Sequence, residues 1–239
     1  MRSLKWGPIG AGDIVRRRVA PALAGLDSCE IVAVSRERAE LAEGFETEFG
    51  INRWYADWRD LLADDEPRHW FIEKAKSKKQ KAKSKKQKAK SGGGPMIDFG
   101  CHRLEVLTDL FGDVGRMGSL TANVIFNHEV KDTAAVLLQF TSGTCATVVV
   151  THAVRESQDT LDIFGTAGSI HIAALNKGEI RIVDAVGQRT EQYPPSHNLH
   201  LPLIKDFAAA VLEDREPRVT GETCRVIASL EDEIYGRTN

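Results

Sequence analysis

The sequence predicts an α/β domain at the N-terminal end of the chain and an α+β domain with an open, mainly antiparallel sheet at the C-terminal end. Two observations lead to this prediction. The first 65 residues alternate between strand-like and helix-like segments, which is the order found in doubly wound parallel sheets. From Gly92 onward, one helical segment precedes a succession of short strand-like runs separated by turn residues, and two helical segments close the chain.

The N-terminal elements follow one another as strand, turn, helix, strand and helix. LKWGPI (4–9) is a short apolar run, and EIVAVS (30–35) has the composition of a buried strand. Asp57 is the expected N-cap of the helix WRDLLAD (58–64). Apolar residues recur at helical spacing after each of the two strands, at Ile14, Val15, Val19 and Leu23 and then at Leu41, Ala42, Phe45 and Phe49.

The N-terminal domain, predicted over 1–73, is short of strands. After Leu62, only HWFI (69–72) is strand-like before a lysine-rich stretch begins. A parallel sheet of two strands leaves its faces and edges uncovered, and doubly wound folds carry further strands on both sides of the first one. The sequence therefore predicts an incomplete domain.

The C-terminal part, 92–239, is predicted to combine one sheet with three helices. Leucines at helical spacing place the first helix after the GGGP turn, and the other two are expected at about 200–213 and 221–235. The strand-like runs are SLTANVIF (119–126), DTAAVLLQF (132–140), TCATVVVTH (144–152), DTLDIF (159–164), SIHIAA (169–174) and EIRIVD (179–184).

The composition is that of a folded globular protein, with 42% hydrophobic and 28% charged residues. No apolar run approaches the roughly 18 residues that span a bilayer, and MRSLKWGPIG reaches glycine too early for a signal peptide, so we expect a cytoplasmic protein without membrane contact. Four scattered cysteines without a Cys-x-x-Cys pair predict reduced thiols, mostly in the core. No metal site is expected, because the histidines lack ligand spacing: His152, His171, His197 and His200.

A lysine-rich stretch, 74–91, repeats the phrase KAKSKKQ at 74–80 and 81–87 and begins it again. Three interpretations stay open: a solvated linker, a phosphate-binding arm, and an unassigned segment that stands in for other residues. Its place where strands are missing favours the last one. The stretch holds ten lysines, which leaves 22 basic and 34 acidic residues elsewhere, so we do not expect nucleic-acid binding by the rest of the chain.

The turn KWGPIGAGDI places two glycines between the first strand and the first helix, which is typical of a Rossmann-like dinucleotide site. A diphosphate would contact the turn and the helix N-terminus. The third glycine of the usual motif is absent, and a tight turn without a ligand remains an alternative. The second strand ends in Ser35 and Arg36 instead of an acid, which favours NADP(H) over NAD(H). The predicted cofactor-binding residues are Gly10, Ala11, Gly12, Asp13, Ile14, Ser35 and Arg36.

With these residues and GGGPMIDFGCH (92–102), the chain resembles the Gfo/Idh/MocA family of NAD(P)-dependent oxidoreductases, and GTAGSI (165–170) and REPRVTGE (215–222) add to the resemblance. The family's signature lies at its nicotinamide and substrate site, which implies catalytic roles for Asp98 and His102. An imidazole can exchange a proton with a carbinol oxygen, and a carboxylate can orient the imidazole ring. Without the family, Asp98 reads as an N-cap and His102 as a polar helix residue.

The family also carries a Glu-Lys-Pro motif, and FIEKA (71–75) resembles it, with Lys74 in the place of the catalytic lysine and Ala75 in the place of proline. Lys74 also begins the lysine repeat, so the match could be a coincidence. If it is real, the repeat bridges or masks a gap in the first domain.

The resemblance implies an oxidoreductase that transfers a hydride between nicotinamide and a sugar, polyol or related carbonyl compound. It also implies that 92–239 binds substrate and forms a homo-oligomer through its sheet. Two alternatives stay open: an inactive homologue that keeps nucleotide binding, and an adaptor that binds nucleic acid or acidic partners through its lysines.

Overall fold

The structure is a computed structural model. It forms two compact units that interleave along the chain: the first combines Met1–Ala75 with Ser157–Arg218, and the second combines Lys76–Glu156 with Val219–Asn239. The contiguous domains expected from the sequence stay a prediction. Within the described residues, no helix is both long and apolar enough to cross a membrane. The residues that the structure describes are 3–38, 44–45, 47–51, 53–65, 69–72, 94–127 and 130–236.

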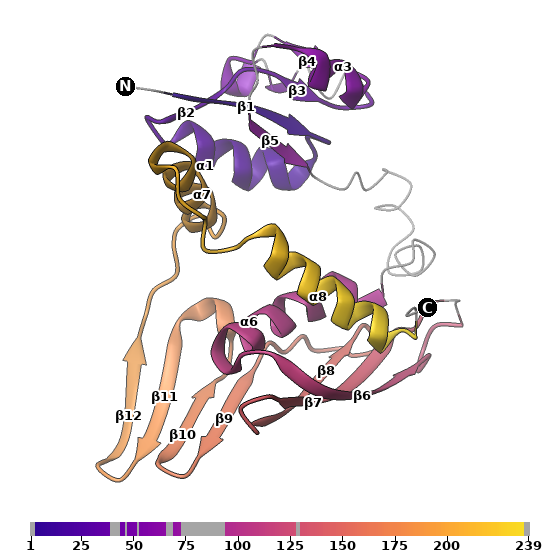
Figure 1. The fold of residues 1–239 in the computed structure, drawn as a ribbon, viewed down its shortest axis with the longest axis vertical. Helices are drawn as coiled ribbons and strands as arrows, with labels where there is room; N and C mark the ends of the chain where they lie inside the picture. The colour runs from indigo at the N-terminus through magenta and orange to yellow at the C-terminus, as the bar shows by residue number, and fades with distance from the viewer. Residues whose placement is uncertain are drawn as a thin grey trace. The chain divides into compact units, whose positions relative to one another are not determined.

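The first unit contains a parallel sheet centred on β1 (Leu4–Ile9). One edge of β1 pairs with β2 (Cys29–Ile31) and then with β3 (Val34–Ser35), and its other edge pairs with β5 (His69–Ile72). The single strand predicted at 30–35 is therefore two short strands, β2 and β3, which both pair with β1. Beyond β3 lies β4 (Trp54–Tyr55), also parallel, which the sequence analysis did not predict (Figure 1). The described sheet thus has more strands than expected, and the incompleteness of the domain stays a prediction.

A helical segment follows β1 and packs its apolar face into the core of this unit. It is continuous from η1 (Val15–Val19) into α1 (Ala20–Ala24), and Val15, Val19 and Leu23 are fully buried, as their spacing predicts. Ile14, which we expected on the same face, is 42% exposed. It precedes the first buried position by one residue, so it points about a quarter turn away from it.

The helix α7 (Leu201–Glu213) belongs to the same core, although it lies more than 100 residues further along the chain. Its Ile204 and Ala208 are buried there, and the ring of Phe207 lies 5.7 Å from that of Trp6 in β1. Figure 1 shows α7 beside α1. Burying an isoleucine side chain contributes about 2 kcal/mol, so α7 stabilises the sheet that carries the glycine turn.

The short helix α3 (Trp58–Ala63) confirms the predicted cap. The Asp57 carboxylate accepts a 2.9 Å hydrogen bond from the Arg59 N–H, which satisfies one of the helix's unpaired donors. The predicted helix around Phe45 and Phe49 is described in part, and those two rings lie 5.7 Å apart.

The first unit also carries an antiparallel sheet in the order β12-β11-β10-β9. Its turn GTAG requires glycine at its last position: Gly168 has φ 155°, and a Cβ there would lie 2.2 Å from the Val183 carbonyl oxygen. This explains the GTAGSI motif structurally. The bounds of these elements are β9 (Leu161–Gly165), β10 (Gly168–Ile172), η4 (Leu175–Lys177), β11 (Glu179–Asp184) and β12 (Gly187–Gln192).

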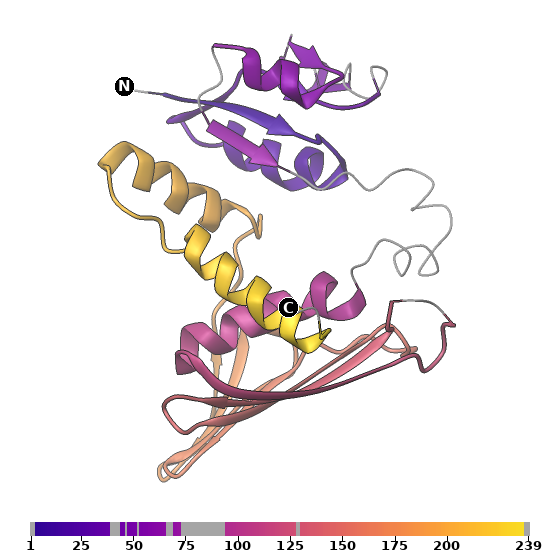
Figure 2. The ribbon, with the colours of Figure 1, turned by 45° about the vertical axis from the view of Figure 1, so that its right-hand side comes forward.

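The second unit is a three-stranded antiparallel sheet whose inner face is covered by helices. Alternate residues of the central strand, Ala134, Val136, Leu138 and Phe140, are buried. Figure 2 shows α6 and α8 on one face of this sheet. The elements are η3 (Met96–Gly100), α6 (Cys101–Phe111), β6 (Val114–Ala122), β7 (Thr133–Phe140), β8 (Cys145–Thr151) and α8 (Gly221–Ile234).

Two expectations for the C-terminal part need correction. The strands form two separate antiparallel sheets of three and four strands, not one open sheet. The strand expected at 119–126 is shifted, because β6 runs from Val114 to Ala122 and residues 123–126 form a loop. The reason for the loop is a buried carboxylate, Asp132, which binds its amide groups.

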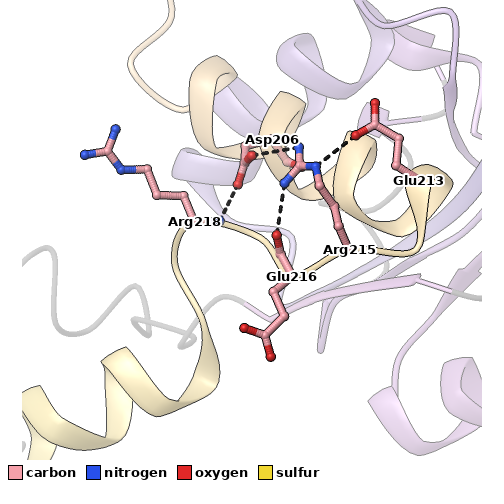
Figure 3. Close-up of polar contacts among 5 residues, drawn as sticks. All are labelled: Asp206, Glu213, Arg215, Glu216 and Arg218. Atoms are coloured by element: carbon pink, nitrogen blue, oxygen red, sulfur yellow. Dashed lines mark hydrogen bonds and ion pairs between the residues drawn. The ribbon is translucent and has the colours of Figure 1, made fainter.

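The REPRVTGE segment fixes the end of α7. Asp206 accepts a 2.7 Å bond from the Arg218 N–H and a 3.0 Å bond from the Arg215 guanidinium, which also pairs with Glu213 at 2.8 Å and donates to the Glu216 carbonyl (Figure 3). The Arg218 N–H, followed by Arg215, lowers the pKa of Asp206 despite the opposing effect of desolvation. The motif therefore has a structural function, because it holds the chain where it leaves the first unit.

Candidate functional site

The glycine turn lies at the carboxyl end of β1. Gly10 has φ 76°, a left-handed conformation that favours glycine, and Ala11 is fully buried. The N–H groups of Gly10 and Ala11 both donate to the Ser35 carbonyl oxygen at 3.0 Å. The helix then starts with a 3.0 Å bond from the Arg16 N–H to the Gly12 carbonyl. The turn is therefore fixed to the end of the neighbouring strand.

Ser35 and Arg36 lie beside this turn, as the parallel register requires, since Ile9 pairs with Ser35. Ser35 is 3% exposed, whereas Arg36 is half-buried. The Arg36 N–H donates to the Tyr55 carbonyl at 2.9 Å. Ligands of open α/β sheets bind outside the carboxyl ends of the strands, so the structure brings the predicted residues to the expected edge.

Tyr55 ends β4, and its surroundings were missed by sequence reasoning. Its hydroxyl donates to the Asp64 carboxylate at 2.8 Å, and Arg53 pairs with the same carboxylate at 3.0 Å. The Asp64 hydrogen bond, followed by desolvation, raises the pKa of Tyr55. A strand of two residues has no detectable periodicity, so only the register with β3 places these groups next to Arg36.

Asp98 and His102 lie on one continuous helical segment of the second unit. The segment begins at Gly94 and runs through η3 into α6, so Asp98 lies inside the helical segment. The interpretation of Asp98 as an N-cap is therefore wrong. The Asp98 side chain is 22% exposed, whereas His102 is exposed. The assignment of catalytic roles to these two residues remains a prediction.

The structure adds His152, which follows β8 directly, to this group. Its Nε2 atom lies 3.7 Å from the Asp98 Oδ2 atom, and its side chain is 14% exposed. The ring of Phe99 meets the imidazole edge to face at a centroid distance of 5.7 Å. Sequence reasoning set His152 aside because it has no metal-ligand spacing. Only the packing of β8 against η3 brings it to Asp98.

The backbone of His152 is held by a buried acidic residue, Asp132. The His152 N–H donates to the Asp132 carbonyl at 2.8 Å. The Asp132 carboxylate, 2% exposed, accepts N–H bonds of 2.8 to 2.9 Å from Val124, Ile125 and Phe126 and a 2.8 Å bond from the Thr133 hydroxyl. Burial acts to raise the pKa of Asp132, but these donors outweigh it and hold the pKa at about 2.

The remaining predictions fall outside these two groups. Lys74 and the lysine repeat lie outside the described residues. In the described part of the chain, no cluster of three or more His, Cys, Asp or Glu side chains could hold a metal ion.

The expectation of mostly buried thiols is wrong, because Cys145 and Cys224 are exposed on the sheet and helix surfaces. A shallow hollow of about 550 Å³ is lined by Arg17, Arg18, Pro21, His197, Asn198 and Leu199.

A model of the GFO/IDH/MocA C-terminal domain matches residues 56–171, a range that contains Asp98, His102 and His152. A D-apiose dehydrogenase of Paraburkholderia graminis is 30% identical over 103 residues, and an uncharacterized oxidoreductase of Rhizobium meliloti is 29% identical over 91 residues. The chain is therefore similar to the GFO/IDH/MocA family over this range. The two matches cover 41% and 33% of this chain but only 28% and 27% of those relatives.

Solved structures share the fold of this chain. An Agrobacterium radiobacter oxidoreductase, solved with NAD+, L-tartaric acid and magnesium, has a TM-score of 0.78 at 18% identity, covering 98% of this chain and 96% of that one. A 3-ketoreductase of Actinomadura kijaniata with NADP and TDP-benzene has a TM-score of 0.78 at 18% identity, covering 98% of each chain. A Bordetella pertussis dehydrogenase with NADH and UDP-GlcNAcA has a TM-score of 0.77 at 15% identity, covering 98% and 95%.

Proposed function

We propose that this protein is an NAD(P)-dependent oxidoreductase that transfers a hydride between nicotinamide and a sugar, polyol or related carbonyl compound. The observation that carries the proposal is the glycine turn of β1, which two hydrogen bonds fix to the end of β3 beside Arg36. The relatives add support, since they include a D-apiose dehydrogenase, and the similar structures contain NAD+, NADH or NADP.

The turn fits a dinucleotide with one refinement of the predicted roles. Because the Gly10 and Ala11 N–H groups donate to Ser35, these two residues would shape the turn and let the diphosphate approach the main chain. The donors would come from the start of the helix, at Gly12, Asp13 and Ile14. The helical segment from Asp13 to Ala24 is long enough for its dipole to favour an anion at this end.

Arg36 is the residue that would select NADP(H). Ser35 is nearly inaccessible, so its hydroxyl is poorly placed for a ligand, whereas Arg36 is half-buried at the same strand end. A guanidinium binds a phosphate through charge-assisted, bidentate hydrogen bonds. We therefore propose NADP(H) as the preferred cofactor, with NAD(H) as the weaker one.

Asp98 and His102 would carry the proton transfer. When bound, the nicotinamide supplies or accepts the hydride. In the oxidation direction, His102 would take the proton of the carbinol hydroxyl while the carbon gives up its hydride, and in reduction it would return that proton to the oxygen. The Asp98 carboxylate, four residues earlier on the same helical segment, would orient the His102 imidazole ring.

The test of this proposal combines binding and turnover. NADPH and NADH are titrated by their fluorescence, and cofactor oxidation is then followed with a panel of aldoses, ketoses and small aldehydes. Tighter binding of NADPH than of NADH, with turnover of at least one sugar-like carbonyl, supports the proposal. Binding without turnover supports the inactive homologue, and the absence of both refutes the dinucleotide site.

We also propose a homo-oligomer formed through the outer face of the β6–β8 sheet. Leu120, Leu137 and Val149 are 72%, 58% and 68% exposed, and the register places Leu120 and Val149 on either side of Ala135. A contiguous apolar face of this kind is typical of an association surface. Its occupant would be a second copy of the chain, and light scattering after size-exclusion chromatography would measure the assembly.

A further inference from the structure

We propose that His152 is a positioning residue for Asp98: its imidazole holds the carboxylate in the orientation that the predicted proton transfer needs. This inference rests on the proposed function and deepens it. The two side chains come from residues 54 positions apart, at the end of β8 and within η3. Their nearest atoms, Nε2 and Oδ2, are 3.7 Å apart, which is an ion-pair separation and longer than a hydrogen bond.

The environment of the imidazole restricts its movement. One side of the ring meets Phe99 edge to face, and Phe99 is the neighbour of Asp98, so the same turn of η3 contacts the ring twice. At 14% and 22% exposure, the His152 and Asp98 side chains are largely shielded from water. An electrostatic interaction between shielded groups is screened less, and is therefore stronger, than one at the surface.

The main chain on both sides of His152 is also fixed. Its N–H bonds to Asp132, and the Thr151 hydroxyl accepts a 2.9 Å bond from the Ala153 N–H and lies 2.8 Å from the Thr133 hydroxyl. Asp132 and Thr133 are joined in turn by a 2.8 Å bond. This network ends β8 and sets the position from which the imidazole reaches Asp98. A side chain that is itself held by its neighbours is what positioning of a reactive group requires.

A second His–Asp pair in the first unit provides a matched control. His171 Nδ1 lies 2.6 Å from Asp162 Oδ1, and its Nε2 lies 2.9 Å from the Ser169 hydroxyl. This pair joins adjacent strands, β9 and β10, and Asp162 is half-exposed. It has the same chemical groups at a shorter distance, yet it belongs to no predicted site. Removing it tests whether losing any His–Asp pair reduces turnover.

The experiment compares His152→Leu, His152→Gln and His152→Asn with the wild type and with His171→Leu. We measure kcat, KM, NADPH affinity and the unfolding midpoint. Leucine removes the polar group that faces the carboxylate, and the glutamine amide can place an N–H near the Nε2 position, whereas the asparagine amide lies near the Nδ1 position. We expect kcat to fall about 10- to 100-fold in the leucine and asparagine variants, because a small misplacement of a reacting group has an effect of this size. In the glutamine variant, kcat should return toward the wild-type value. NADPH affinity and the His171→Leu variant should match the wild type.

Coupling to Asp98 is tested by a double variant. If His152 acts through Asp98, Asp98→Asn with His152→Leu should lose no more turnover than Asp98→Asn alone. Additive losses, wild-type turnover of His152→Leu, or equal losses for leucine and glutamine would overturn the inference while the oxidoreductase stands. If the leucine variant does not fold, the asparagine variant takes its place with the same expected loss. A wild type that lacks NAD(P)-dependent turnover would overturn both proposals.

Discussion

Replacing Asp132 by asparagine is expected to destabilise the second unit at neutral pH and to have less effect in acid. The carboxylate binds three consecutive amide groups of the loop that follows β6, together with the Thr133 hydroxyl, in a buried position. Asparagine keeps the size of the side chain but offers one acceptor oxygen and no charge. The amides that lose this acceptor must bond to water instead, and the charge-assisted strength of their bonds to the carboxylate is lost.

The magnitude follows from the pKa of Asp132, which is about 2 in the folded protein against an ordinary value of 3.8. This difference corresponds to about 2 kcal/mol of stability from ionised Asp132. Because the folded-state pKa is lowered, the contribution is complete above the unfolded-state pKa and is lost as the pH falls through the folded-state pKa. It should therefore be complete at pH 7, fall to roughly half near pH 3, and disappear below about pH 2.

The assay must follow the second unit alone. All four tryptophans lie in 1–75, within the first unit, so fluorescence would report on the wrong part of the molecule. Met96 is fully buried in the second unit, and its sulfur becomes accessible to peroxide only when that unit opens. A urea titration with a brief peroxide pulse, read by mass spectrometry of the Met96 peptide, gives the free energy of opening at each pH.

The control variant is Asp113→Asn, which makes the same chemical change at an exposed position of the same unit. We expect it to leave the urea midpoint unchanged at both pH values, whereas Asp132→Asn lowers the midpoint at pH 7 and lowers it less at pH 3. An equal loss at pH 7 and pH 3 would show that shape, not charge, carries the effect. If Asp132→Asn kept the wild-type urea midpoint at pH 7, the Asp132 carboxylate would not stabilise the second unit.

Three further variants test the proposed function. Arg36→Ala should weaken NADPH about 10- to 100-fold and NADH little, because only the 2′-phosphate loses a charge-assisted contact; equal weakening in titrations of both cofactors would reject the assignment. His102→Ala should lower kcat by roughly 10²-fold or more with unchanged NADPH affinity; unchanged turnover would remove it from the chemistry. Leu137→Asp should convert the oligomer to a monomer in light-scattering measurements, because it buries a charge at the proposed interface; an unchanged mass would exclude that face.

Much of the first unit could be predicted because its signals are local. The spacing of Val15, Val19 and Leu23 alone identifies the buried face of a helix, and Asp57 stands directly before its helix with a side chain suited to capping it. The convergence of the glycine turn and Arg36 also follows from general rules, since parallel strands place their carboxyl ends at one edge of a sheet. Neither inference needs knowledge of distant contacts.

The parts that were missed depend on distant contacts. The letters NVIF (123–126) have strand character, but Asp132 binds the amides of Val124, Ile125 and Phe126 and so takes them out of the sheet. A carboxylate that competes with strand pairing leaves no periodic signal in the sequence. His152 was missed for a related reason: its partner is 54 residues away, and no spacing rule connects the end of a strand to a helix in another layer.

The order of elements along the chain has a consequence for the glycine turn. Its sheet is covered by α7, whose Ile204 and Ala208 complete the core around Trp6, and α7 follows the whole three-stranded sheet in the sequence. The Asp206 cluster then fixes the end of α7 before the chain returns to the second unit. The N-terminal segment thus lacks part of its own core until residues beyond 200 are in place. The first unit, which carries the glycine turn, can therefore be completed only after the chain has passed through most of the second unit.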